Sequence, residues 1–69
     1  MSTIAKRIKT LRKRQGLTQD EVALSAGVSR ILAHNLETGK TTNPTIATLR
    51  ALARCFGVTV AYLIGEAER

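Results

Sequence analysis

Hydrophobic residues recur along the chain at spacings of three and four, the period of a helix that packs one face against a core. No stretch alternates polar and apolar residues with a β-branched bias for long enough to predict a strand. The sequence therefore predicts an all-α protein, a compact five-helix bundle with short connections. The expected helices cover residues 3–15, 19–26, 29–38, 45–56 and 59–64, and residues 66–69 are expected to fray.

Short signals at the ends of the second and third helices predict a helix-turn-helix motif over residues 18–38. Thr18 and Glu21 have the spacing of a capping box, which starts the second helix. Gly27 can adopt a positive φ after that helix ends, and Ser29 supplies an N-cap for the next helix. The turn is therefore about three residues long, as a helix-turn-helix requires.

The third expected helix, residues 29–38, has two faces of different chemistry. One face is apolar, and the opposite face carries Arg30, Ile31, His34 and Asn35. Such donors, acceptors and methyl groups match the base edges of a DNA major groove. The alternative is a solvated outer face, which any amphipathic helix in a soluble bundle has.

Each residue of this polar face has an expected partner on DNA. Arg30 suits a bidentate contact to guanine, and Asn35 suits adenine or a phosphate. Ile31 suits a thymine methyl group. His34 stays open between a donor to a base or phosphate and a solvated side chain.

The net charge of +6 is concentrated near the start of the chain. Six cations precede Gln15 with no acid among them, and the rest of the chain is neutral. Such a segment attracts a polyanion, so nucleic acid and an anionic membrane are candidates beside a plain solvated surface. Its modest apolar face weakens the membrane alternative. These cations are Lys6, Arg7, Lys9, Arg12, Lys13 and Arg14.

Composition excludes several other classes of protein. Aromatic residues are limited to Phe56 and Tyr62, which argues against a platform for single-stranded nucleic acid. One histidine, scattered acids and no glycine-rich phosphate loop argue against an enzyme, a metal site or a cofactor. Cys55 is the only cysteine, so no internal disulfide forms, and we expect it half-exposed or at a subunit contact. With no membrane-spanning run and no secretory signal, we expect a cytoplasmic protein.

The chain length of 69 residues leaves room for one domain, residues 1–69, with a thin core that self-association would support. The core side of the fourth helix is expected to be Ile46, Leu49, Leu52, Ala53 and Phe56. Five later apolar residues exceed what this core needs. We expect them to form a dimer surface: Val58, Val60, Tyr62, Leu63 and Ile64.

In their order and spacing, the motifs of this chain resemble the lambda-repressor-like helix-turn-helix family, also called the xenobiotic-response-element family. Members are prokaryotic and phage regulators, so the resemblance also implies a location at the nucleoid. The resemblance covers nearly the whole chain. The sequence departs from the family at two positions: Ala33 stands where the family usually has a larger aliphatic residue, and Leu32 stands where it usually has a small or polar one. From this we infer that the third helix packs in a slightly altered position. It is carried by residues 17–19, Ala23, residues 27–29, 36–40 and 43–45, Leu49, and residues 52–53, 56–58 and 62–66.

The resemblance implies a partly buried ion pair between Arg12 and Glu37 that ties the first helix to the third. It also implies contacts with the DNA backbone from the start of the second helix and from the loop after the third. In related proteins this loop is more basic, which suggests a weaker grip here or compensation by the first helix. The expected backbone contacts are Gln19, Ser29, Lys40, Thr42, Asn43 and Arg12.

Together these features predict a regulator of transcription, a repressor, that binds double-stranded DNA with residues 29–38 in the major groove. As a homodimer it would present two reading helices about 34 Å apart, so the operator should be an inverted repeat. One alternative is an antitoxin that covers a toxin or other protein partner and also binds DNA to regulate itself. Another is a nonspecific basic coat, which would bind every duplex equally.

Overall fold

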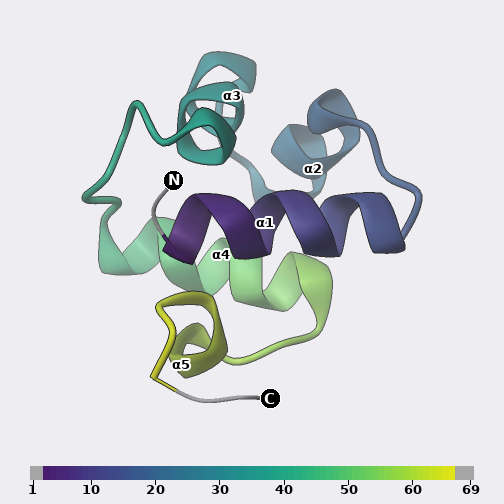
Figure 1. The fold of residues 1–69 in the computed structure, drawn as a ribbon. Helices are drawn as coiled ribbons and strands as arrows, with labels where there is room; N and C mark the ends of the chain where they lie inside the picture. The colour runs from purple at the N-terminus through teal and green to yellow at the C-terminus, as the bar shows by residue number, and fades with distance from the viewer. Residues whose placement is uncertain (1–2, 67–69) are drawn as a thin grey trace.

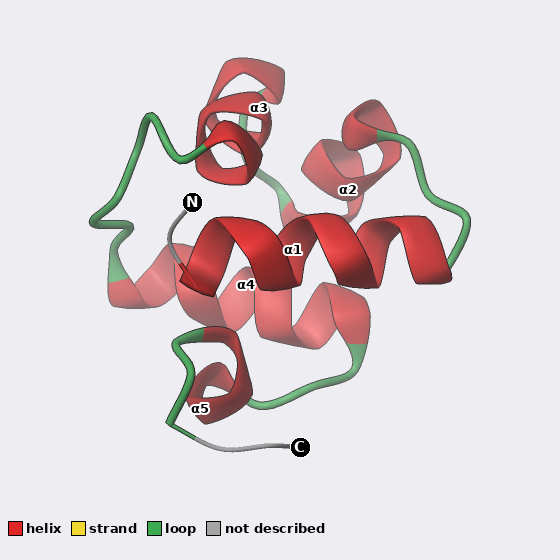
Figure 2. Cartoon of the chain, viewed as in Figure 1, coloured by secondary structure: helices red, strands yellow, loops and turns green. Residues whose placement is uncertain are grey.

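The computed structural model describes residues 3–66, all of whose regular structure is helical, as predicted (Figures 1 and 2). Residues 67–69 of the expected frayed end lie outside the described residues. Three helices start one residue later than predicted, because their first expected residues are N-caps with an extended backbone. The hydroxyl of each N-cap accepts a hydrogen bond from a backbone amide; these residues are Ser29, Thr45 and Thr59. The helices are α1 (Thr3–Arg14), α2 (Gln19–Ala26), α3 (Arg30–Thr38), α4 (Ile46–Phe56) and α5 (Val60–Leu63).

The predicted helix-turn-helix signals are confirmed at both ends of α2. The Thr18 hydroxyl accepts from the Glu21 amide at 3.1 Å, and the Glu21 carboxylate accepts from the Thr18 amide at 2.9 Å. Gly27 ends α2 with a φ of 69°, a left-handed conformation that favours glycine. The capping box therefore fixes where α2 begins, and Gly27 fixes where it ends and the short turn to α3 starts.

Helix α1 crosses the molecule between the α2–α3 pair on one side and α5 on the other, with α4 packed behind it (Figure 1). The core is built where these helices meet. Burial of its side chains removes apolar surface from water and is the main force that holds α3 in place. The core cluster contains Ile8, Leu11, Val22, Leu36, Leu52, Ala53, Phe56 and Leu63.

The expected inward position of Ile46 is wrong, because this side chain is 58% exposed. Ile46 is the first residue of α4, where the helix enters from the loop at the edge of the molecule (Figure 1). The stripe of α4 becomes buried one turn later, at Leu49. Its periodicity is correct, but the stripe extends beyond the helices that cover it.

The expected dimer surface also needs correction, because Leu63 is 0% exposed and belongs to the core. Val58, Val60 and Tyr62 are half-buried and pack against the same core. Arg7 fixes this arrangement: its Nη1 donates to the Tyr62 carbonyl at 2.7 Å, and its guanidinium lies 4.3 Å from the ring centroid. Much of this apolar segment therefore completes the core of one chain.

Cys55 is half-buried on α4, with a free thiol. In the described part of the chain, no helix is both long and apolar enough to cross a membrane. Across the same residues, no three metal-ligating side chains gather.

Candidate nucleic-acid interface

Helix α3 presents to solvent the polar face that its sequence predicts. The Ser29 hydroxyl accepts from the Leu32 amide at 3.0 Å and so fixes where the helix starts. Arg30, Ile31 and His34 are then exposed, Ile31 at 73%, and Asn35 is half-buried. The opposite face is buried against the bundle through Ala33, Leu36 and Glu37.

A hollow of about 330 Å³ lies on the surface where α2 and α3 meet. It is lined by Gln19 from α2 and by Arg30, Ile31 and His34 from α3. Three of these side chains carry hydrogen-bonding groups, and one is aliphatic. The helix-turn-helix thus brings an expected backbone contact beside three of the expected base readers.

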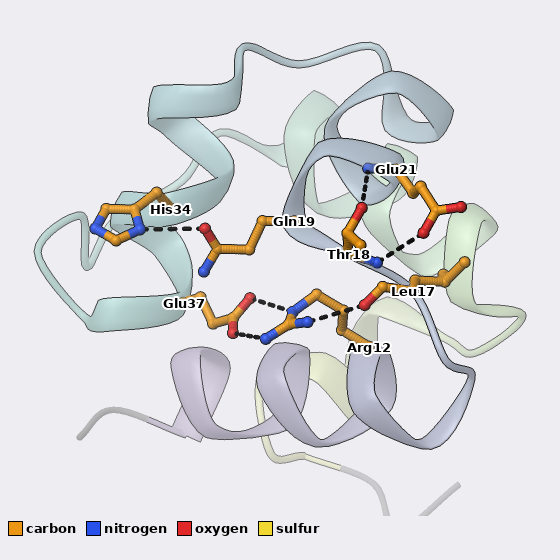
Figure 3. A network of polar contacts seen from close by, with 7 residues as sticks. All are labelled: Arg12, Leu17, Thr18, Gln19, Glu21, His34 and Glu37. Atoms are coloured by element: carbon orange, nitrogen blue, oxygen red, sulfur yellow. Dashed lines mark hydrogen bonds and ion pairs between the residues drawn. The ribbon is translucent and has the colours of Figure 1, made fainter.

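Beneath this surface, Arg12 of α1 and Glu37 of α3 form a bidentate ion pair (Figure 3). Arg12 Nε donates to one carboxylate oxygen at 2.8 Å, and Nη2 donates to the other at 2.6 Å. Nη1 donates to the Leu17 carbonyl at 2.8 Å. The side chains are only 15% and 5% exposed, so this pair clamps α1 to α3 and to the segment that leads into α2.

Ionisation of Glu37 depends on this clamp. Burial alone would raise the pKa of the Glu37 carboxyl, because a charge loses hydration there. The hydrogen bond and the charge of Arg12, with smaller contributions from Gln19 and Lys9, outweigh burial and hold that pKa below its ordinary value. The same bond raises the pKa of Arg12. Both groups are therefore charged at neutral pH.

This geometry argues against a second role for Arg12 as a contact to phosphate. All three of its guanidinium nitrogens already donate to protein oxygens, and the side chain is largely buried. Arg12 acts on the surface indirectly, since it holds α3 in place.

The expected basic surface of α1 is likewise divided between two tasks. Arg7 binds α5 and Arg12 binds α3, so two of the six cations stabilise the fold. Lys6, Lys13 and Arg14 are exposed and remain available to an anion. Charge alone suggested one surface, because the sequence does not reveal which cations find partners within the bundle.

Two polar contacts on the outer surface join α2 to α3. Arg30 Nε lies 2.7 Å from Asp20 Oδ1, with 75% and 63% of the two side chains exposed. His34 Nδ1 lies 3.2 Å from Gln19 Oε1. Sequence reasoning missed Asp20, and only the expectation that α2 and α3 lie side by side could have indicated it.

The remaining expected backbone contacts lie at the edges of this surface. Ser29 precedes α3, and Lys40, Thr42 and Asn43 lie in the loop that leads from α3 to α4; all four are exposed. The loop folds back on the helix, since the Thr41 amide donates to the Asn35 carbonyl at 3.1 Å. The loop therefore borders the end of α3 opposite to the hollow.

Comparison with known proteins identifies relatives over nearly the whole chain. The family model described as helix-turn-helix matches residues 8–63. An uncharacterized HTH-type transcriptional regulator of Coxiella burnetii is 36% identical over 96% of this chain and 31% of its own length. The immunity repressor protein of Bacillus phage phi105 is 38% identical over 93% of this chain and 44% of its own. The chain thus spans less than half the length of these two relatives.

Solved structures of SinR have the same fold. The N-terminal DNA binding domain of SinR from Bacillus subtilis superposes with a TM-score of 0.88 at 33% identity, over 96% of both chains. SinR in complex with DNA superposes with a TM-score of 0.85 at 34% identity, over 88% of this chain and 97% of that one. The fold and its helix-turn-helix are therefore those of a known group of proteins.

Proposed function

Because this chain belongs to the lambda-repressor-like helix-turn-helix family, we propose that it binds double-stranded DNA in a sequence-specific manner and regulates transcription. The observation that carries this proposal is the outer face of α3. That face places an exposed guanidinium, imidazole and aliphatic side chain around one hollow while the other face is locked into the core. The named relatives are regulators or repressors, and the proposal includes no catalytic step.

In this proposal α3 lies in the major groove and reads base edges. Arg30 contacts guanine, Ile31 packs on a thymine methyl group, and Asn35 contacts adenine or a phosphate. His34 completes the reading face. Arg30 is free to reach a base because its pairing with Asp20 is exposed and exchanges readily with water.

Contacts to the phosphate backbone would fix the register of α3 in the groove. Gln19 and Ser29 stand at the starts of α2 and α3, where unpaired amides favour an anion. Lys40, Thr42 and Asn43 would hold the strand at the far end of α3. These contacts raise affinity on every sequence alike.

The regulator is proposed to act in the cytoplasm as a homodimer and as a repressor. Its half-exposed Val58, Val60, Tyr62 and Ile64 would lie at the contact between copies. A two-fold dimer would place two α3 helices in successive major grooves about 34 Å apart, on an inverted repeat. A repressor among the relatives supports the direction of control.

Selection of bound sequences from a random duplex pool tests this function. We expect enrichment of a palindromic site. Arg30→Ala should lose preference at one base pair only, whereas equal losses on selected and random duplexes would remove Arg30 from the readers. A pool without enrichment would favour a nonspecific coat, and a chain that selected a DNA site and also captured a toxin would favour the antitoxin alternative.

A further inference from the structure

Four polar side chains lie in a row that leads from α1 to the outer face of α3 (Figure 3). The buried pair of Arg12 and Glu37 is its inner end. Gln19 lies between this pair and His34, and its Oε1 is 3.2 Å from the Nδ1 of His34. Gln19 thus stands between the buried ion pair and one side chain of the reading face.

The carboxylate of Glu37 decides which way the Gln19 amide points. A carboxylate accepts hydrogen bonds and donates none, so the NH2 group of Gln19 faces it. Figure 3 shows the amide nitrogen on the side of Glu37, and the Gln19 side chain is among the groups that lower the pKa of Glu37. The opposite orientation would place the amide oxygen against the carboxylate, acceptor to acceptor. The amide oxygen is therefore left facing His34.

This orientation determines the tautomer of His34. An amide oxygen only accepts, so Nδ1 of the ring carries the hydrogen and donates it to Gln19. In the neutral ring, Nε2 then has a lone pair and no hydrogen. The His34 side chain is exposed and lines the hollow, and among residues 3–66 no hydrogen bond or ion pair involves Nε2. The group offered to the groove is an acceptor.

We propose that the Arg12–Glu37–Gln19 chain sets His34 as a hydrogen-bond acceptor that reads an exocyclic amino group in the major groove. Such a group is N4 of cytosine or N6 of adenine, whereas the hydrogen-bonding groups of guanine and thymine on that edge are all acceptors. Gln19 is then a positioning residue that determines specificity through His34. This inference rests on the proposed function and differs from both alternatives that the sequence left open for His34, a donor and a solvated side chain.

The tautomer is measurable in the free protein without DNA. Long-range ¹H–¹⁵N correlation of the imidazole at about pH 8, above the ordinary pKa of histidine, separates the two neutral forms. We expect Nδ1–H in the wild type. Gln19→Met keeps the length of the side chain but removes the oxygen, so this variant should shift toward Nε2–H. A wild-type protein in the Nε2–H form would overturn the proposal, whatever its affinity for DNA.

Base preference provides the second test. His34→Ala locates the base pair concerned, as the one position where preference disappears. At that pair we expect the wild type to bind cytosine or adenine about five- to tenfold more tightly than guanine or thymine, the value of one hydrogen bond. Replacement of adenine by purine, or of cytosine by 2-pyrimidinone, removes the amino group and should cost the same factor.

The Gln19→Met variant separates positioning from general affinity. Loss of the Gln19 amide should weaken binding equally on all duplexes, and in addition erase the preference at the His34 pair. In the His34→Ala background, Gln19→Met should leave preference at that pair unchanged. A Gln19→Met protein that keeps the wild-type preference, or a wild type that prefers guanine or thymine there, would overturn the proposal. Failure of the proposed function is distinct, since the wild type would then select no sequence.

Discussion

Two ion pairs of nearly equal length join helices of this protein, and they have different roles. Arg12 and Glu37 meet at 2.6 Å, and Arg30 and Asp20 meet at 2.7 Å. The first pair is 15% and 5% exposed, whereas the second is 75% and 63% exposed. The charged groups and the shortest distances are alike, but the inner pair is bidentate and buried, whereas the outer pair joins Arg30 Nε to Asp20 in an exposed position.

Burial makes the inner pair a fixed part of the fold. Water cannot replace a lost partner there, and removal of one residue strands the charge of the other. On the surface, water hydrates either charge when the pair opens, so the pair contributes little. The same contrast makes Arg30 free to exchange Asp20 for a base, while Arg12 stays with Glu37.

The largest expected effect comes from Glu37→Ala. This change leaves the Arg12 guanidinium largely buried without its carboxylate and should cost about 3 to 5 kcal/mol in the free energy of unfolding. Urea denaturation measures the loss. Glu37→Gln is the matched control, because it keeps the shape and one acceptor, and should lose less. A free energy of unfolding equal to that of the wild type would mean that the ion pair contributes nothing to stability.

Acid should weaken the same pair. The pKa of Glu37 is lower in the folded protein than the ordinary value of 4.5, so folding favours the ionised form. Its contribution to stability is full above that ordinary value and is lost as the pH falls through the lowered pKa of the folded state. Urea denaturation between about pH 7 and pH 3 should show this loss in the wild type. Glu37→Gln should remove that part of the pH dependence, and an unchanged profile would contradict the assignment.

Local signals explain why the sequence predicts most of this fold. Thr18 caps α2 and Ser29 caps α3 through contacts within three residues, so neighbours along the chain suffice to place the helix ends. Ile46 and Leu63 were misplaced because burial depends on which helices cover them. Periodicity indicates which residues lie on the same face of a helix. Only the packing of the helices determines where along its length that face is covered.

The site follows the same division. The outward face of α3 is a property of one helix and is predictable from its period. The contacts of Asp20 with Arg30 and of Gln19 with His34 join different helices, so no spacing within one helix predicts them. The Arg12–Glu37 pair was expected from family resemblance and not from spacing. What the structure adds is therefore the pairing of side chains across the turn.

On DNA, the order of importance of the two arginines should reverse. Arg30→Ala should cost about 1 to 3 kcal/mol at one base pair of a selected site, because a bidentate reader is lost. Lys40→Ala is the matched control for loss of one exposed cation. It should weaken binding to all sequences alike. The slope of the logarithm of the association constant against the logarithm of salt concentration should fall in magnitude by about one, the value of one phosphate contact. Mobility-shift titrations at two salt concentrations distinguish the two patterns.

The smallest expected effect on stability comes from Asp20→Asn, which breaks the outer pair and keeps the shape of the side chain. Because both partners are mostly exposed, the free energy of unfolding should change by no more than about 1 kcal/mol. The same urea titrations that measure Glu37→Gln provide the comparison, since each variant neutralises one carboxylate of one pair. A loss from Asp20→Asn as large as that from Glu37→Gln would show that the outer pair is structural. Arg30 would then be held by the fold, as Arg12 is, and could not serve as a reader of bases.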